Sequence, residues 1–214
     1  MSIDILHNAA AEPRARILLA HGAMAPMDSA FMEALSGCLT AHNISVLRFE
    51  FAYMAGRRTG GKKRPPPRAE RLLEEYSAAV SQLNADTGDA APLIIGGKSL
   101  GGRVASMVAD ELHADRQIAG LTCLGYPFHP PNKPENLRTA HLKTLNCPAL
   151  IVQGERDPFG TPDEIAGYTI DKRIQLHWIG DGDHDFGPRG RSGFTKRGNI
   201  EAAADAIATF ATGL

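Results

Sequence analysis

Residues 93–102 read LIIGGKSLGG, and this short stretch decides the fold. Its first three residues, Leu93–Ile95, are apolar and predict a buried strand. Gly97 and Gly101 stand two positions before and after Ser99, where a sharp turn leaves no room for side chains. Helical periodicity resumes just after Ser99. We therefore expect a strand, a strained turn that exposes the Ser99 hydroxyl, and a helix.

Similar units recur on both sides of this stretch. Short runs rich in Ile, Leu and Val are apolar on both faces, which is typical of buried parallel strands covered by helices. These runs are Ile17–Ala20, Ile44–Phe51, Ile118–Leu124, Ala149–Val152 and Ile174–Ile179. Between them, helical periodicity covers residues 28–41, 69–84 and 199–212. Strands that alternate with helices predict an α/β fold with a mostly parallel sheet.

The composition is that of a globular domain. The chain has 214 residues, of which 43% are hydrophobic and 22% charged, so we expect one domain over residues 1–214. A net charge of −1 argues against binding nucleic acid or an anionic membrane surface by bulk electrostatics. Cys38, Cys123 and Cys147 have neither metal-type spacing nor an even count for disulfides. We expect reduced thiols and a cytoplasmic location; the oligomeric state stays open.

One segment does not fit regular structure. Residues 57–68 read RRTGGKKRPPPR, with six basic residues, two glycines and three consecutive prolines. This composition predicts a loop between a strand and a helix. Such a loop would lie at the carboxyl end of the sheet, where ligands bind in open α/β folds. It could attract an anionic substrate, or it could be an ordinary solvated loop.

Two other readings of the glycine-rich turn fail. A phosphate-binding loop that ends in Gly97-Lys98-Ser99 needs glycine at position 92, which is Pro92. A dinucleotide-binding fingerprint that starts at Gly97 needs glycine at position 99, which is the serine. A turn without chemistry remains as an alternative.

A serine nucleophile needs a general base, and the base needs a carboxylate to orient it. Asp157 follows the predicted strand 149–152, and His184 follows the next one, 174–179. The three residues thus occur in the order serine, acid, histidine. Glu155 is a rival acid, while a turn aspartate and an exposed loop histidine are the unremarkable alternatives.

The same edge of the sheet can supply an oxyanion hole, which needs two backbone N–H donors. We expect one from Leu100, directly after the serine, and one from Ala23 or Met24 in the turn after strand 17–20. Asp181, Asp183 and Asp185 suggest a calcium loop, but Phe186 and Ser192 replace its glycine and glutamate. We expect no metal and no cofactor.

With these elements in this order, the chain resembles the α/β-hydrolase superfamily over nearly its whole length. More narrowly, it is similar to small lidless proteins labelled dienelactone-hydrolase-like and to the testis-expressed hydrolase-like group. The narrower match is carried by Arg48–Arg58 with Arg64-Pro65-Pro66, Gly96–Arg103, Gly125–Pro131 and Gln153–Gly160. Dienelactone hydrolases proper use a cysteine nucleophile, so their substrate does not carry over to Ser99.

The resemblance implies a sheet of about 7–8 strands with helices on both faces and acyl hydrolysis through an acyl-serine, but it implies no particular substrate. Residues 126–146 are too few for a cap domain, so we expect an open site and a small ester or thioester as substrate. A catalytically idle interaction module is the alternative, and an acyltransferase would use the same residues. The candidate substrate contacts are Met24, Arg57, Arg58 and Tyr126.

Overall fold

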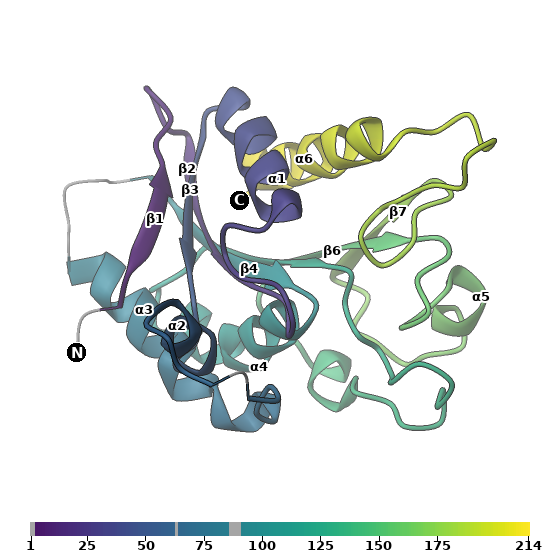
Figure 1. The fold of residues 1–214 in the computed structure, drawn as a ribbon, viewed down its shortest axis with the longest axis horizontal. Coiled ribbons are helices and arrows are strands. Elements are labelled where there is room, and N and C mark those ends of the chain that lie inside the picture. Colours follow the sequence, from purple (N-terminus) through teal and green to yellow (C-terminus); the bar gives the residue numbers. More distant parts are fainter. Residues whose placement is uncertain (1–2, 63, 86–90) are drawn as a thin grey trace.

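A single twisted sheet forms the centre of the protein (Figure 1). The computed structural model describes residues 3–62, 64–85 and 91–214. Within these residues, seven strands pair in the order β1-β3-β2-β4-β5-β6-β7. All neighbours are parallel except β1, which runs antiparallel to β3. The strands are β1 (Ile5–Asn8), β2 (Ala15–Ala20), β3 (Ile44–Phe49), β4 (Leu93–Lys98), β5 (Gly120–Leu124), β6 (Ala149–Gly154) and β7 (Ile174–Ile179).

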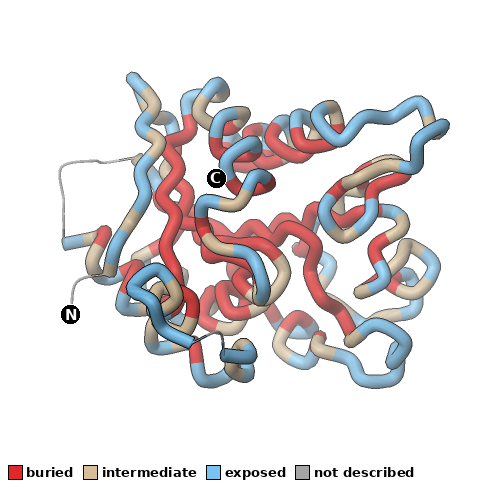
Figure 2. Tube along the Cα trace, viewed as in Figure 1, coloured by how far each residue is buried: buried red, intermediate tan, exposed pale blue. Residues whose placement is uncertain are grey.

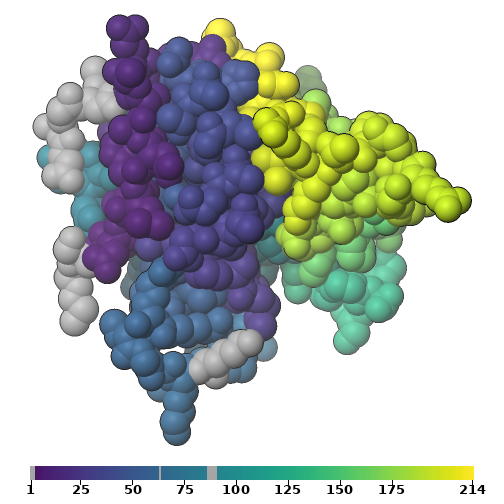
Figure 3. All heavy atoms as spheres, turned by 45° about the horizontal axis from the view of Figure 1, so that its top comes forward, coloured from purple at the N-terminus to yellow at the C-terminus, as the bar shows by residue number. Residues whose placement is uncertain are grey.

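Helices cover both faces of the sheet. The helices α1 (Ala30–Ala41) and α6 (Lys196–Thr212) lie side by side over one face, as Figures 1 and 3 show. On the other face lie α2 (Ala52–Arg58), α3 (Leu73–Ala85) and α4 (Leu100–Ala114). The remaining helical segments are short: α5 (Pro162–Ile165) and the 3-10 turns Ala69–Arg71 and Ala140–Lys143.

The core consists of two apolar layers separated by the sheet, and the strands are the most thoroughly buried part of the chain (Figure 2). Successive strand residues point to opposite faces. In β2, Ile17 and Leu19 therefore pack with α1 and α6, while Leu18 and Ala20 pack with α3 and α4. Burial on both faces explains why the central strands β2 to β6 are mostly apolar.

The structure confirms the predicted fold class and each of the six predicted strands, with differences at the edges. The sequence prediction missed β1, a short edge strand with two exposed residues, because little of it is buried. It also ran β3 on to Phe51 and placed Arg57 and Arg58 in a loop. In the structure β3 ends at Phe49, and both arginines lie in the last turn of α2.

The chain has no cap domain. Between β5 and β6, residues 125–148 contain one short 3-10 turn and otherwise form irregular loops (Figure 1). The carboxyl ends of β2, β4, β5, β6 and β7 meet at one edge because these strands are parallel. Among the described residues, no helix is long and apolar enough to cross a membrane.

Candidate active site

Ser99 lies between β4 and α4 in a strained backbone conformation. Its φ is 51° and its ψ is −111°, outside the regions that residues with a side chain normally occupy. A Cβ at Gly97 would come within 2.5 Å of the Ala20 carbonyl oxygen, and one at Gly101 would strike the same oxygen. Both positions therefore require glycine, as the sequence predicted. The Ser99 N–H donates to the Leu124 carbonyl at 2.9 Å, which anchors the turn to β5.

Asp157 and His184, which are 27 residues apart in the chain, meet beside this turn. The Nδ1 atom of His184 lies 2.8 Å from Oδ2 of Asp157, and the Asp157 side chain is completely buried. The His184 side chain is 22% exposed. With Nδ1 donating to the carboxylate, Nε2 is the ring atom left to accept a proton.

Gln153, at the end of β6, holds the Asp157 carboxylate. Its Nε2 donates to Oδ2 of Asp157 at 3.0 Å, and its Oε1 accepts from the Tyr126 N–H at 2.7 Å. The Phe159 N–H donates to the other carboxylate oxygen at 2.9 Å. The sequence prediction assigned no role to Gln153, although a fully buried glutamine in a strand must hydrogen bond to something.

The surroundings of His184 connect it to the Ser99 turn. A side chain on Gly125, directly after the Leu124 that anchors Ser99, would come within 3.2 Å of the His184 ring. The Phe159 ring lies against the imidazole, with 4.4 Å between the ring centroids. Phe159 and Ser99 in turn line one cavity. The structure thus gathers Ser99, Asp157 and His184 at one edge of the sheet; their catalytic roles stay a prediction.

Lys98, the residue before Ser99, links the turn to the histidine loop. Its Nζ lies 3.2 Å from Oδ1 of Asp185, and its side chain is only 8% exposed. Burial lowers the pKa of Lys98, while Asp185 acts in the opposite direction. A buried lysine needs a partner of this kind. The sequence prediction did not identify this pair because it joins the end of β4 to the loop after β7, which only the fold brings together.

Ser99 opens onto a surface cavity of about 570 Å³. Leu100 and Ala23, the two expected oxyanion donors, line the same cavity. Among the described residues, none accepts a hydrogen bond from either N–H. Leu100 is the first residue of α4, where helix geometry leaves the N–H without an internal partner.

The predicted substrate contacts fare differently. Tyr126 is completely buried and donates its hydroxyl to the Arg138 carbonyl, so the structure corrects its assignment as a substrate contact. Arg58 is held by Glu50 and Asp28, and Arg57 donates to the Arg64 carbonyl. Neither arginine is among the residues that line the cavity at Ser99, because α2 carries both away from it.

Met24 is 62% exposed in the turn after β2. It follows Ala23 in the chain, but it is not among the residues that line the cavity. A role of Met24 in binding therefore stays a prediction.

A serine and a histidine contact each other elsewhere on α4. Oγ of Ser106, in the second turn of this helix, is 2.8 Å from Nε2 of His141 and also donates to the Arg103 carbonyl. The Tyr126 hydroxyl lies 3.4 Å from the same histidine nitrogen. Burial and the charge of Arg103 lower the pKa of His141 to about 4.

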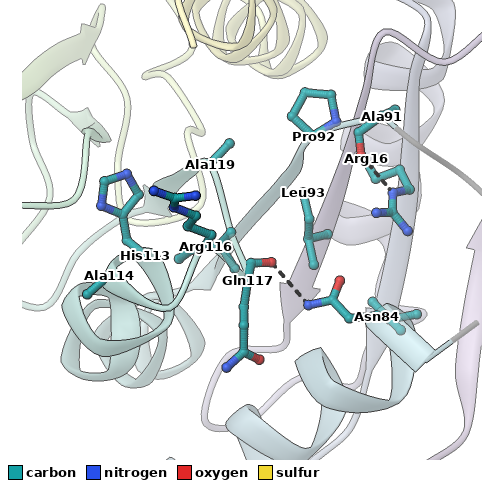
Figure 4. Close-up of a pocket in the computed structure, with 12 residues that line it drawn as sticks. Arg16, Asn84, Ala91, Pro92, Leu93, His113, Ala114, Arg116, Gln117 and Ala119 are labelled. Atoms are coloured by element: carbon teal, nitrogen blue, oxygen red, sulfur yellow. Dashed lines mark hydrogen bonds between the residues drawn. The ribbon is translucent and has the colours of Figure 1, made fainter. Parts of the chain in front are cut away.

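A larger hollow, about 850 Å³, lies at the opposite end of the strands (Figure 4). Arg16 and Leu93, near the starts of β2 and β4, line it. Within it, Asn84 donates to the Gln117 carbonyl and Arg16 to the Ala91 carbonyl. Ligands in open α/β sheets bind at the carboxyl ends, so this hollow is the weaker candidate despite its size.

Comparison with known proteins agrees with this geometry. A family model described as an alpha/beta hydrolase domain matches residues 13–212. A dienelactone hydrolase from Anabaena variabilis has a similar structure, with a TM-score of 0.73 and 18% identity over 98% of this chain and 90% of that chain. An alpha-beta serine hydrolase homologue from Coxiella burnetii gives 0.71 and 16% over 96% and 89%.

A serine hydrolase without a lid, from Xanthomonas campestris, gives a TM-score of 0.69 and 16% identity over 96% of this chain and 89% of that chain. At these identities the structural likenesses concern the fold alone. The family match covers most of the chain, including the whole of the site described above.

Proposed function

The chain belongs to the alpha/beta hydrolase family, and from that premise we propose that it is a serine hydrolase that cleaves a small acyl ester or thioester. The observation that carries the proposal is the buried hydrogen bond between His184 and Asp157, next to a strained turn that holds Ser99 at a cavity.

The reaction proceeds in two halves. The Ser99 hydroxyl attacks the acyl carbonyl while Nε2 of His184 takes its proton, and the N–H groups of Leu100 and Ala23 bind the oxyanion. His184 then protonates the leaving alcohol or thiol as the bond to it breaks, leaving an acyl-serine. In the second half His184 deprotonates a water, the water attacks the acyl-serine, and the acid is released with the Ser99 proton restored. Asp157 stabilises the imidazolium in both halves.

The open site favours small substrates. Without a cap, nothing encloses a long acyl chain, and the cavity of about 570 Å³ is small for a lipid. The proteins of similar structure include a dienelactone hydrolase, an esterase domain and a monoacylglycerol lipase. Turnover that rises steadily as the acyl chain lengthens would contradict the small-substrate part of the proposal.

Labelling with a fluorophosphonate, read by intact mass, tests the proposal. This reagent forms a covalent adduct with an activated serine. We expect one adduct on the natural protein, none on Ser99→Ala, and an unchanged adduct on Ser106→Ala. The Ser106 variant is the matched control because Ser106 also contacts a histidine.

An adduct that is lost in Ser106→Ala but persists in Ser99→Ala would identify Ser106 as the reactive serine and contradict the proposed mechanism. An unlabelled but folded natural protein would contradict hydrolysis altogether and favour an interaction module.

A further inference from the structure

The cavity at Ser99 is strongly basic. Three arginines line it, Arg68, Arg103 and Arg138, and they face a single acidic residue, Glu70. Oε1 of Glu70 accepts from Arg103 at 2.7 Å, so one charge is compensated. The guanidinium groups of Arg68 and Arg138 add two further positive charges to the lining of the cavity. The net charge of the whole chain, in contrast, is −1. This local excess of positive charge belongs to the cavity and not to the protein as a whole.

Arg138 is the least compensated of the three. Its backbone is fixed, since its N–H donates to the Phe128 carbonyl and its carbonyl accepts from the Tyr126 hydroxyl. Among the described residues, however, none hydrogen bonds to its guanidinium or to that of Arg68. Burial and the neighbouring charge of Arg103 both lower the pKa of Arg138. A partly buried guanidinium held beside another one is stabilised when an anion joins them.

Arg103 adds a second unused donor. It lies one turn after Ser99 in α4, and its carbonyl is already used by Ser106. The Arg103 side chain is only 18% exposed. Its Nε atom is buried and has no hydrogen-bond partner among the described residues. Unpaired buried donors are uncommon and indicate a place for a ligand or an ordered water.

We propose that this cavity binds a carboxylate on the substrate, with Arg138 as the main contact and Arg68 and Arg103 beside it. The preferred substrate is then an ester that carries a free carboxylate in addition to the bond that is cleaved. A guanidinium donates two parallel hydrogen bonds to a carboxylate, so it selects geometry as well as charge. Two experiments test this inference, one kinetic and one on binding, and only the kinetic experiment rests on the proposed hydrolysis.

This assignment replaces the expected role of Arg57 and Arg58. Arg58 already binds two carboxylates, and the Arg57 guanidinium lies 5.7 Å from the centre of the Tyr53 ring. The contact with an anionic substrate, which the sequence analysis associated with Arg57 and Arg58, is therefore assigned to the arginines that line the cavity. Of the basic segment 57–68, Arg68 is the arginine that lines the cavity.

The kinetic arm compares two substrates of the same length, the para-nitrophenyl half-ester of adipic acid and its neutral methyl ester. We expect the natural protein to prefer the half-ester in kcat/KM by about tenfold, the lower range for a hydrogen bond to a charged group. Arg138→Gln should bring the ratio of the two kcat/KM values, measured on the same variant, close to one, and Arg138→Lys should keep part of the preference. Arg197→Gln, on the distant α6 and 90% exposed, is the control for loss of one charge.

The binding arm uses Ser99→Ala, which cannot form the acyl-serine, so it reports on the cavity even if the protein hydrolyses nothing. Calorimetry should show the half-ester binding about tenfold more tightly than the methyl ester, and Arg138→Gln in the same background should abolish the difference. Equal binding of the two esters, or a preference that survives Arg138→Gln, would overturn the carboxylate site. A natural protein that forms no fluorophosphonate adduct would instead overturn the proposed hydrolysis and leave the carboxylate site to be judged by this binding experiment.

Discussion

Two combinations of a serine and a histidine can be compared in this protein: the proposed pair of Ser99 and His184, and the pair of Ser106 and His141, whose side chains lie 2.8 Å apart. Their surroundings differ in the features that matter for catalysis. Ser99 precedes α4 in a strained turn and opens onto a cavity, whereas Ser106 lies inside α4 and is buried. His184 donates to a buried carboxylate, while no described residue hydrogen bonds to Nδ1 of His141. A serine and a histidine at 2.8 Å are therefore not enough to indicate an active site.

The two histidines have different surroundings. In the proposed mechanism Asp157 orients the His184 ring and stabilises the imidazolium that forms when this histidine takes the Ser99 proton. Around His141, burial and Arg103 disfavour the charged form, so this histidine serves as a neutral hydrogen-bond partner for Ser106. We therefore expect proton transfer at His184, while the contact between His141 and Ser106 joins α4 to the segment between β5 and β6.

The largest contrast is expected from replacing each histidine. His184→Gln should lower kcat for para-nitrophenyl acetate by about 10⁴-fold, because the serine loses its base. His141→Gln should change kcat by less than about threefold, since glutamine still hydrogen bonds to Ser106. Comparable losses in the two variants would mean that the pairs are not functionally distinct.

Gln153→Met sharpens the comparison at the carboxylate. The variant keeps the shape of the side chain but leaves Oδ2 of Asp157 with one donor fewer. We expect kcat to fall by about 10- to 100-fold, together with a lower thermal midpoint, because a buried hydrogen-bond network is broken. Gln175→Met, an exposed position on neighbouring β7, is the control. An unaltered kcat would show that Asp157 needs no support from Gln153.

The pH dependence of stability tests the second pair. The pKa of His141 is about 4 in the folded protein against 6.5 for a free histidine. The unfolded chain therefore takes up a proton that the folded protein refuses, and stability is lost as the pH falls from 6.5 towards 4. We expect about 2 kcal/mol of this loss to disappear in His141→Gln, as followed by urea unfolding across that range. If the free energy of unfolding changed with pH in the same way for both proteins, His141 would have the same pKa in the folded and unfolded chains, which would contradict this prediction.

The smallest effect is expected at Lys98. Lys98→Met removes the charge that holds Asp185 and so loosens the His184 loop. We expect kcat to fall by up to about tenfold with little change in KM, because orientation and not binding is affected. Lys98→Arg should restore part of the rate, and Lys133→Met, at an exposed position in the loop between β5 and β6, should have no effect. A change confined to KM would assign Lys98 to substrate binding instead.

Much of this protein follows from short stretches of its sequence. The runs at 93–95 and 149–152 are apolar on both faces, which is typical of a buried parallel sheet. Gly97 and Gly101 are required because a side chain at either would strike Ala20. The positions of Asp157 and His184 after successive strands predict that both reach the same edge, because parallel strands end together.

The tertiary structure alone decided which polar groups remain unpaired. Arg58 and Arg138 are the same residue type, yet Glu50 and Asp28 neutralise the first, while the guanidinium of the second lies at the cavity that Ser99 lines and pairs with no carboxylate among the described residues. Tyr126 stands in a motif that suggested substrate contact, but its ring is in the core. Local sequence specifies backbone conformation and periodic burial; pairing between residues distant in the chain depends on how the loops pack, and no local pattern encodes it.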